Sequence, residues 1–246
     1  MKMISIITVT YNCASQIEET LLSVFSQDYP NIEYIVIDGN STDGTQEIIE
    51  RYISKIDKFI SEKDRGIYDA MNKGILNAKG DWIYFFNAGD VFYNTHIISS
   101  ILQKNNIGVD VIWGDYVIRR TKELQKVICK TPFFENKKFY HGMGFSHQSV
   151  FVKTSLAKKY MFDLSFRCCA DFNMMMTLYK NGARFEYLPL PIAIVEGRYG
   201  FSDSNKVIQM KDTARILGIE NSIRFKFFYI WWRFKEIIKK IIGRNS

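Results

Sequence analysis

The sequence predicts an α/β fold in which a mostly parallel central sheet is flanked by helices. Three observations support this prediction. The chain has 246 residues, 47% of them hydrophobic and only four of them proline, which is enough to bury the core of one domain. Apolar runs alternate with helical patterns through the first hundred residues. These runs are apolar throughout, which is typical of strands buried on both faces.

Four strand–helix units are expected in the first hundred residues. The strands read ISIITVTYN, IEYIVIDG, DKFISE and DWIYFFNAGD, and the helical patterns that follow cover residues 15–26, 43–53, 67–78 and 95–103. A small antiparallel part should come next, because VDVIWGDYVI and KVICK resemble a hairpin. The last predicted elements are a helix in ADFNMMMTLYKNG, a strand in RFEYLPLPIAIVE and a helix over residues 205–217.

Residues 1–220 are expected to form one domain, because they contain no internal repeat, low-complexity tract or linker. The excess positive charge lies outside this domain. Residues 221–246 carry seven basic groups against one acid, or +6, whereas residues 1–220 carry 26 basic and 25 acidic groups, or +1. This distribution argues against a protein-wide nucleic-acid face and favours a local electrostatic anchor.

Cysteine usage and hydropathy favour a cytoplasmic protein. The cysteines include an adjacent pair and show no metal-ligand spacing: Cys13, Cys129, Cys168 and Cys169. The first apolar run is too short for the core of a signal peptide, and no later run is long and charge-free enough to span a bilayer. Neither secretion nor membrane spanning is therefore expected.

A binding site is expected where the parallel strands end, because ligands bind beyond the carboxyl ends of the strands in such sheets. The four strand ends carry Tyr11 and Asn12, Asp38 and Gly39, Glu62 to Asp64, and Asn87 to Asp90. Three of these four ends include an acid, so the functional residues are expected at this edge of the sheet.

Four stretches in this order resemble the family 2 inverting glycosyltransferases with the GT-A fold: TVTYN, IVIDGNSTDGT, DRGIYDAMNKGI and GDWIYFFNAGD. The similarity covers about residues 3–205, and GIYDAMNKG with NAGD is similar to a subgroup that makes bacterial surface polysaccharides. The resemblance implies a Rossmann-like sheet with a nucleotide-binding half over about 1–115 and an acceptor half over about 116–220. It also implies inverting transfer from a nucleotide-diphosphate sugar, expected to be a UDP-sugar, to a hydroxyl of a glycan or lipid-linked acceptor.

The resemblance also suggests how the donor base is held. In the family, the acid that ends the second strand accepts a hydrogen bond from a pyrimidine N–H, which points to Asp38. Tyr11 is expected to stack or bond nearby, with Thr8 or Thr10 close to it. The alternative for Asp38 is that it shapes a turn and caps the next helix.

Arg65, Asp69 and Asn72 follow the third strand and are expected to reach the ribose or the diphosphate of the donor. Asp69 and Asn72 are three residues apart and share one face of a predicted helix. A solvated helix start explains Asp64 and Arg65 equally well.

The fourth strand ends in Asn87, Ala88, Gly89 and Asp90, where relatives commonly carry Asp-Ala-Asp-Asp, whose first and third acids touch the ribose and a divalent metal. Here Asn87 can still bond a ribose hydroxyl, and Gly89 lets the backbone approach the diphosphate. Asp90 is the expected ligand of Mg²⁺ or Mn²⁺, with waters and phosphate oxygens completing the shell. A plain strand-to-turn transition is the alternative for this stretch.

A general base is required as well, because a sugar hydroxyl is a poor nucleophile until its proton is removed. Asp171 is the expected base, since relatives place an acid at the start of this helix facing the acceptor; the alternative is a helix-start acid favoured by the helix dipole. His147 and Gln148 are expected beside the acceptor and phosphates, although a lone histidine is more often structural. Arg198 and Ser202 are expected in a loop that orders over the diphosphate, as similar loops do in the family.

The segment 221–246 predicts a basic amphipathic helix. Apolar residues recur at three- and four-residue steps: Ile223, Phe227, Ile230, Trp231, Phe234, Ile237, Ile238, Ile241 and Ile242. Such a helix, with a charge of +6, favours an anionic membrane surface. The protein is therefore expected on the inner face of the cytoplasmic membrane, where similar enzymes extend lipid-linked acceptors. The alternative is that the stripe packs on the catalytic domain or on a second subunit.

Two other functions compete with this interpretation. A nucleotidyltransferase on a related sheet would carry a glycine-rich, basic signature just after the first strand, and TVTYNCASQ has neither glycine nor lysine. A non-catalytic nucleotide-binding module is suggested by the pI of about 9.1. However, the excess charge lies in the end segment, and the acids at the strand ends would repel phosphate without a metal.

Overall fold

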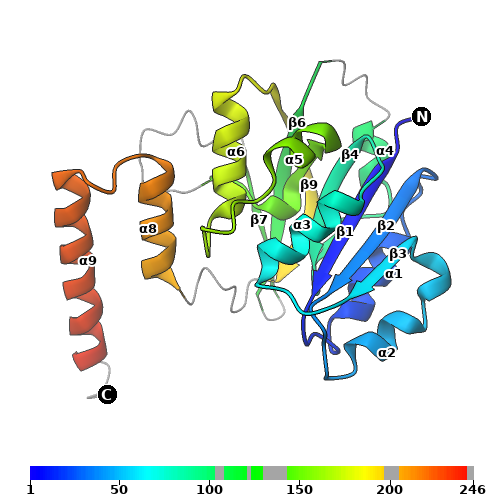
Figure 1. The fold of residues 1–246 in the computed structure, drawn as a ribbon, viewed down its shortest axis with the longest axis horizontal. Coiled ribbons are helices and arrows are strands. Elements are labelled where there is room, and N and C mark those ends of the chain that lie inside the picture. Colours follow the sequence, from blue (N-terminus) through cyan, green and yellow to red (C-terminus); the bar gives the residue numbers. More distant parts are fainter. Residues whose placement is uncertain (103–107, 121–122, 130–142, 197–204, 243–246) are drawn as a thin grey trace.

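The computed structural model describes residues 1–102, 108–120, 123–129, 143–196 and 205–242, and the strands within them form one sheet (Figure 1). The strands are β1 (Ile4–Thr10), β2 (Ile32–Asp38), β3 (Lys58–Ser61), β4 (Trp82–Asn87), β5 (Val91–Phe92), β6 (Val111–Arg120), β7 (Glu123–Val127), β8 (Val150–Lys153) and β9 (Phe185–Glu196). The helices are α1 (Ile17–Phe25), α2 (Thr45–Glu50), α3 (Ile67–Asn77), α4 (Ile97–Leu102), α5 (Thr154–Tyr160), α6 (Ala170–Lys180), α8 (Lys206–Ile216) and α9 (Ile223–Ile242).

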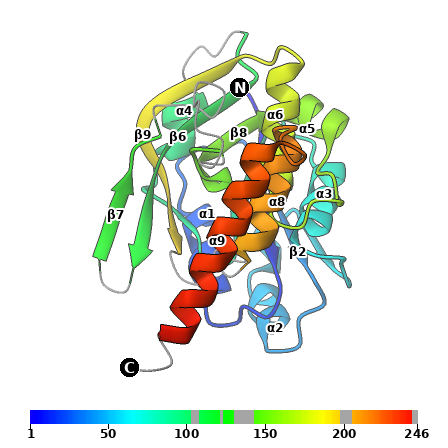
Figure 2. The same cartoon turned by 90° about the vertical axis from the view of Figure 1, so that its left-hand side faces the viewer.

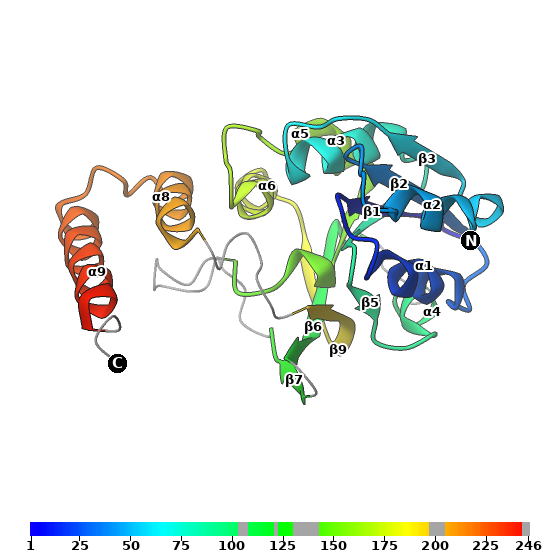
Figure 3. The ribbon, with the colours of Figure 1, turned by 90° about the horizontal axis from the view of Figure 1, so that it is seen from below.

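The first four long strands form the parallel half of the sheet, in the order β3-β2-β1-β4. Every residue of β1 is buried. Ile7 and Val9 belong to one hydrophobic core and Ile4 and Ile6 to the other, which explains why the strand is apolar throughout. In Figure 3, α3 and α5 cover one face of these strands and α1 and α4 cover the other. The predicted α/β sheet flanked by helices is therefore confirmed.

The second half of the chain extends the same sheet with both antiparallel and parallel pairs. β8 runs antiparallel to β4, β6 runs antiparallel to β8, and β9 lies parallel to β6. β6 and β7 form the expected hairpin. Its second strand begins at Glu123, three residues earlier than predicted. The two-residue strand β5 was not predicted. It follows the NAGD turn directly and pairs with β9, so the turn is tied to the second half of the chain.

Helices α8 and α9 stand apart from the sheet, on the far side of α6 (Figures 1 and 2). α8 contacts α6 and buries Thr213, Ala214 and Ile216. α9 is 20 residues long and lies beside α8. Within the described ranges, no helix has both the length and the apolar character needed to cross a membrane.

Candidate active site

The carboxyl ends of β1 to β4 lie level with one another. Backbone pairing places Thr10 beside Asp38, Asp38 beside Ser61, and Val9 beside Asn87. The residues that follow these positions therefore share one edge of the sheet. Thr10 Oγ1 and Asn87 Oδ1 are buried at this edge without a hydrogen-bond partner among the residues that the structure describes. Buried acceptors of this kind are rare in folded proteins, so the edge suits a ligand that donates hydrogen bonds.

Tyr11, Gly39 and Asp64 form an open corner of this edge. The side chain of Tyr11 is 63% exposed. A Cβ atom on Gly39 would lie 2.7 Å from Oδ2 of Asp64 and 3.2 Å from Cδ2 of Tyr11, so only a glycine lets the ring and the carboxylate meet over the end of β2. An exposed ring beside a carboxylate can bind a planar base that carries an N–H group. This role of Asp64 was not predicted, and the sequence signal that could have found it is its position just after the third strand.

Asp38 lies behind this corner, with its carboxylate fully buried. It accepts hydrogen bonds from the N–H of Ser41 (2.9 Å), the hydroxyl of Ser41 (2.5 Å) and the hydroxyl of Ser61 (2.7 Å). Both carboxylate oxygens are thus used inside the protein. This arrangement favours the alternative, in which Asp38 shapes the turn after β2, over the expected contact with the donor base.

Two further residues predicted to contact the donor face the protein interior. Thr8 is fully buried, and its hydroxyl shares a hydrogen bond of 2.9 Å with the hydroxyl of Tyr34. The amide of Asn72 donates to the carbonyl of Phe162 (2.9 Å) and accepts from the N–H of Phe162 (2.8 Å). These contacts favour structural roles for Thr8 and Asn72 over the expected donor contacts, because their polar atoms are already paired.

Arg65 and Asp69 form an ion pair at the start of α3. The carboxylate of Asp69 accepts hydrogen bonds from the backbone N–H of Arg65 (3.0 Å) and from its Nη2 (2.9 Å). The bond from the guanidinium holds the pKa of Asp69 below its ordinary value. The Arg65 side chain is 78% exposed, so Asp69 orients a guanidinium that remains accessible to an anion.

Residues 87–90 form a tight turn after β4. Gly89 has a φ of +99°, in the left-handed region that glycine adopts without strain. Its N–H donates to the hydroxyl of Thr20 (2.9 Å), which donates to the carbonyl of Asp90 (2.9 Å). The N–H of Ala88 bonds to β1 (3.3 Å). Because both N–H groups are paired, the expected approach of a diphosphate to Gly89 is not supported, and the glycine serves the turn.

The carboxylate of Asp90 lies inside this turn and is 3% exposed. It accepts hydrogen bonds from Nε2 of Gln148 (2.9 Å), the N–H of Asn87 (3.2 Å) and the N–H of Glu196 (3.3 Å). Burial raises the pKa of Asp90 to about 6, and the bond from Gln148 partly offsets that rise. The Gln148 amide oxygen accepts from the Ser146 hydroxyl. Gln148 therefore holds Asp90, and its expected contact with acceptor or phosphate stays a prediction.

A divalent cation would find few protein ligands at this turn. In the described part of the chain, no three His, Cys, Asp or Glu side chains are grouped so as to hold a metal. The turn contains the unpartnered Oδ1 of Asn87 and the carboxylate of Asp90, which is buried and accepts three hydrogen bonds. Mg²⁺ is commonly held by one or two protein oxygens together with substrate phosphates and waters. The turn thus fits a cation that arrives with a diphosphate.

Asp171, in the first turn of α6, receives contacts from three elements. Its Oδ1 accepts hydrogen bonds from the N–H of Phe172 (2.8 Å) and the hydroxyl of Tyr68 (3.1 Å). Its Oδ2 lies 3.4 Å from Nδ1 of His147. The other ring nitrogen of His147 lies 3.3 Å from Nδ2 of Asn87. The structure thus joins Asn87, His147 and Asp171, which are far apart in the sequence, into one cluster.

Tyr68 was not predicted as a site residue. Its hydroxyl shares its hydrogen between Asp171 and the carbonyl of Cys168 (2.7 Å). Burial, together with the charge of Asp171, raises the pKa of Tyr68 well above its ordinary value, so the hydroxyl stays a hydrogen-bond donor. The signal that could have found it is its place one helical turn before Asn72 in DRGIYDAMNKG.

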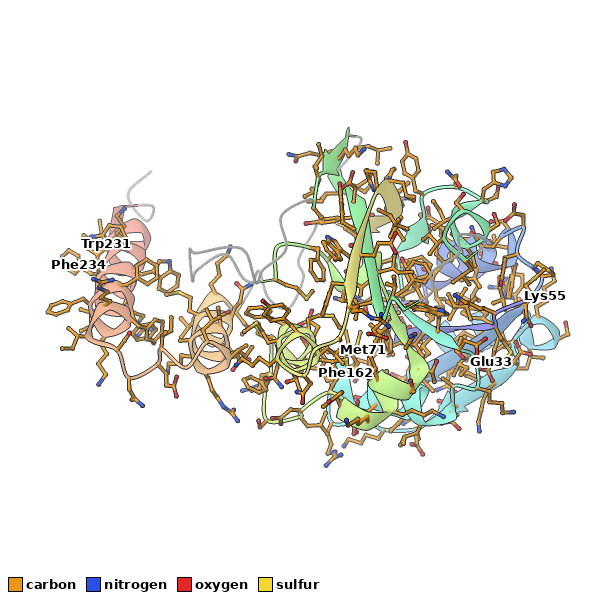
Figure 4. The ribbon with its side chains drawn as sticks, turned by 90° about the horizontal axis from the view of Figure 1, so that it is seen from above. Glu33, Lys55, Met71, Phe162, Trp231 and Phe234 are labelled. Atoms are coloured by element: carbon orange, nitrogen blue, oxygen red, sulfur yellow. The ribbon has the colours of Figure 1, made fainter. Side chains whose placement is uncertain are left out.

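A small cavity lies against Asp171 and His147. Its volume is about 20 Å³, which holds one water or one hydroxyl group. Its other walls are apolar: Phe85, Met143, Val150, Val152, Phe162, Met174 and Met175. Figure 4 labels Phe162 next to Met71, and both side chains belong to the same hydrophobic core. A carboxylate at the rim of an apolar cavity can take a proton from a hydroxyl that enters it.

The two remaining predicted residues, Arg198 and Ser202, lie outside the described residues. The three aspartates of the prediction therefore differ in access. Asp38 is enclosed behind Gly39, Asp90 is enclosed in the turn after β4, and Asp171 is 20% exposed at the cavity.

Comparison with known proteins finds related sequences. A family model described as Glycosyl transferase family 2 matches residues 5–169. An uncharacterized glycosyltransferase of Mycobacterium tuberculosis is 32% identical over 172 residues, which are 68% of this chain and 65%, or slightly less than two thirds, of that relative. A dolichyl N-acetyl-alpha-D-glucosaminyl phosphate 3-beta-D-2,3-diacetamido-2,3-dideoxy-beta-D-glucuronosyltransferase of Methanococcus voltae is 31% identical over 256 residues, covering 95% of this chain and 78% of the relative.

Solved structures share the architecture at low sequence identity. S. aureus TarS 1-349 in complex with UDP-GlcNAc has a TM-score of 0.69 and 20% identity, with coverage of 90% of this chain and 73% of that chain. The mannosyltransferase PcManGT from Pyrobaculum calidifontis, in complex with GDP-Man and Mn²⁺, has a TM-score of 0.67 and 17% identity, with coverage of 88% of this chain and 63% of that chain. At these identities the likeness concerns the fold.

Proposed function

The chain belongs to glycosyl transferase family 2 and has the GT-A fold, and from that premise we propose an inverting transfer of a sugar from a UDP-sugar to a hydroxyl of a glycan or lipid-linked acceptor in bacterial polysaccharide biosynthesis. One observation carries the proposal. Asp171 is held by Tyr68 and His147, and His147 connects it to Asn87 at the edge where a donor would bind. A base placed this close to the donor edge is what direct displacement by a hydroxyl requires.

The donor nucleotide is proposed to lie across the ends of β1 to β3. The exposed ring of Tyr11 would stack on the base, and Asp64 would accept the hydrogen bond that was expected at Asp38. The accessible guanidinium of Arg65 would meet the diphosphate. A uridine donor is supported by the likeness to TarS, whose structure contains UDP-GlcNAc.

The acceptor hydroxyl is proposed to enter the cavity beside Asp171. Oδ2 faces His147 and not the backbone, so it is the oxygen that takes the proton while the hydroxyl oxygen bonds to the anomeric carbon. The bond from that carbon to the diphosphate breaks at the same time, and attack from the opposite side inverts the configuration. Tyr68 and the N–H of Phe172 keep Oδ1 in place during this step.

We propose that Mg²⁺ or Mn²⁺ binds together with the diphosphate, with the Asp90 carboxylate and the Asn87 amide oxygen as its protein ligands. A bound cation would stabilise the negative charge of the leaving diphosphate. The presence of Mn²⁺ with GDP-Man in PcManGT supports a metal at this kind of site.

UDP should raise the melting temperature of the protein more than other nucleoside diphosphates, and Mn²⁺ should enlarge that shift. Only the folded protein binds the nucleotide, so at 100 times the dissociation constant the expected shift is about 5–10 °C. Asp90→Ala should remove the metal-dependent part, because Asp90 is the one carboxylate proposed to hold the cation. A thermal-shift panel of UDP, GDP, ADP and CDP with and without Mn²⁺ measures these effects.

The control for this panel is Glu47→Ala, which removes an exposed acid on α2 and should leave both shifts unchanged. A metal-dependent shift that persists in Asp90→Ala would contradict the metal assignment. If no nucleotide stabilises the wild-type protein, the transferase proposal itself loses its support.

We further propose that α9 holds the enzyme on an anionic bilayer at the inner face of the cytoplasmic membrane. One face of the helix exposes large apolar side chains to solvent: Ile223, Phe227, Ile230, Trp231, Phe234 and Ile238. The described part of the chain leaves this face uncovered, and Figure 4 places Trp231 and Phe234 on the side of the molecule farthest from the sheet. Basic residues flank the stripe, namely Arg224, Lys226, Arg233 and Lys235. Apolar and cationic surfaces together favour an anionic membrane.

Deleting residues 221–246 should abolish co-sedimentation of the protein with phosphatidylglycerol vesicles and leave hydrolysis of the donor intact. Changing Phe227, Trp231 and Phe234 to Ser should weaken vesicle binding by about 100-fold or more, because each side chain loses a buried apolar surface. Leu76→Ser with Leu124→Ser, at exposed positions outside α9, is the matched control. Unchanged vesicle binding, or a dimer in light scattering that dissociates in the triple variant, would contradict the anchor.

A further inference from the structure

Helix α8 lies beyond the part of the chain that the family model matches, yet it contacts the segment that leads into the candidate base. The match ends at residue 169, and α8 begins at residue 206. Residues 165–169 precede α6 and Asp171, and α8 packs against them through three sets of contacts.

Asp212 of α8 binds two successive backbone N–H groups of this segment. Its Oδ2 accepts hydrogen bonds from the N–H of Arg167 (3.1 Å) and from the N–H of Cys168 (2.9 Å). Bonds to a charged acceptor are stronger than bonds between neutral groups. The two flanking contacts between α8 and this segment are an exposed hydrogen bond of Arg215 and a weak sulfur contact of Cys169.

Arg215 makes the first flanking contact, because its Nη2 donates to the hydroxyl of Ser165 (2.9 Å) and its guanidinium lies 4.2 Å from the ring centre of Phe166. Cys169 makes the other, with its Sγ 3.7 Å from the carbonyl of Gln209. The hydrogen bonds of Asp212 are thus the central contact between α8 and the segment that precedes α6.

The backbone of Cys168 is held from two sides. Its N–H bonds to Asp212, and its carbonyl accepts from the hydroxyl of Tyr68. The same hydroxyl donates to Oδ1 of Asp171. A displacement of Cys168 would therefore move the Tyr68 hydroxyl that holds Asp171. Asp212 thus acts on Asp171 through Cys168 and Tyr68, because it is not among the hydrogen-bond partners of Asp171 described above.

We propose that Asp212 is a positioning residue for Asp171, and that α8 therefore contributes to the active site. The inference rests on the proposed function, in which Asp171 removes the proton of the acceptor. Without the Asp212 carboxylate, the two N–H groups lose their acceptor and the segment loses its tie to α8. General-base catalysis depends on placement to a fraction of an ångström, so kcat falls while nucleotide binding at the other strand ends is spared.

Asp212→Ala in the full-length chain should lower kcat for hydrolysis of UDP-GlcNAc by about 10- to 100-fold and leave KM unchanged. Asp212→Asn keeps an oxygen that can accept both N–H groups, so it should recover most of the rate. Glu220→Gln removes an exposed acid just after α8 and serves as the control.

Hydrogen exchange measured by mass spectrometry provides a second readout that does not depend on activity. The amides of Arg167 and Cys168 should exchange faster in Asp212→Ala and not in Glu220→Gln. An unchanged kcat in Asp212→Ala overturns the proposal. A loss of kcat without faster exchange at these two amides also overturns it, because the effect would then not pass through this segment.

Unfolding of Asp212→Ala would be visible as faster exchange in β1 as well. In that case Asp212→Asn and Arg215→Ala provide the test: Asp212→Asn should keep most of the wild-type kcat, Arg215→Ala should have an intermediate kcat, and β1 should stay protected in both. If the wild-type protein hydrolyses neither UDP-GlcNAc nor another UDP-sugar, the proposed function fails. The exchange rates of Arg167 and Cys168 still decide whether Asp212 holds the segment.

Discussion

Replacing Asp171 with Asn should lower the rate of sugar transfer by about 10²- to 10⁴-fold, because an amide cannot take the proton of the acceptor hydroxyl. The substitution preserves size, and its amide oxygen can still accept from Tyr68 and Phe172. UDP affinity should not change, since the proposed nucleotide contacts lie at the ends of β1 to β3. Single-turnover release of UDP from UDP-GlcNAc, together with calorimetric titration of UDP, measures the two quantities separately.

Tyr68→Phe provides a graded comparison for Asp171→Asn. It removes the hydroxyl that holds Oδ1 while the base remains, so the expected loss is about tenfold. Glu47→Gln, an exposed acid on α2, is the control for changing one charge. A rate in Asp171→Asn close to that of the wild type would assign the proton transfer to another group and would remove the observation that carries the proposed function.

The access of the three predicted aspartates explains why Asp171 is the one proposed as the base. Asp38 and Asp90 each accept three hydrogen bonds from the protein and have almost no exposed surface. Asp171 has an oxygen that faces His147 at the rim of a cavity. A proton can be transferred only to an oxygen that the hydroxyl can reach, which leaves Asp171.

The sheet could be predicted, and a candidate site could be proposed at one edge of it, because both follow from rules of chain geometry. Continuous apolar runs separated by helical patterns determined a parallel sheet covered on both faces, and the rule that ligands lie at strand ends pointed to residues such as Tyr11 and Asn87. His147 and Asp171 were suggested by the family resemblance and not by chain geometry, and the structure places His147 3.4 Å from Asp171 and 3.3 Å from Asn87.

The roles of several individual side chains could not be predicted, because a role depends on which partners reach the polar atoms. Asp38 stands where a base-binding acid was expected, but Ser41 and Ser61 occupy its oxygens. Asn72 is on the expected helix, but it bonds to the backbone of Phe162, which is 90 residues away in the sequence. No local pattern reports such distant partners.

Without metal, the contribution of Asp90 to folding stability should fall as the pH rises from about 4 to about 6. Burial raises the pKa of its carboxyl from 3.8 to about 6, so the folded protein holds this proton more tightly than the unfolded chain does. The contribution is fully present below the unfolded pKa and is lost as the pH rises through the folded pKa, a change on the order of 3 kcal/mol. Urea unfolding of the wild type and of Asp90→Ala in chelator measures it, because the difference between the two proteins isolates Asp90.

The difference in unfolding free energy between wild type and Asp90→Ala changes with pH, and the sign of that change shows which of two opposing effects prevails at Asp90. Burial favours the protonated carboxyl, whereas the three N–H groups that bind it and the charge of His147 favour the ionised form. If the N–H groups prevail, the difference between wild type and Asp90→Ala will instead grow with pH. Mn²⁺ should add to the stabilisation by UDP only above about pH 6, because a cation binds the ionised carboxylate. An identical slope with and without Mn²⁺ would mean that Asp90 is not a ligand of the metal.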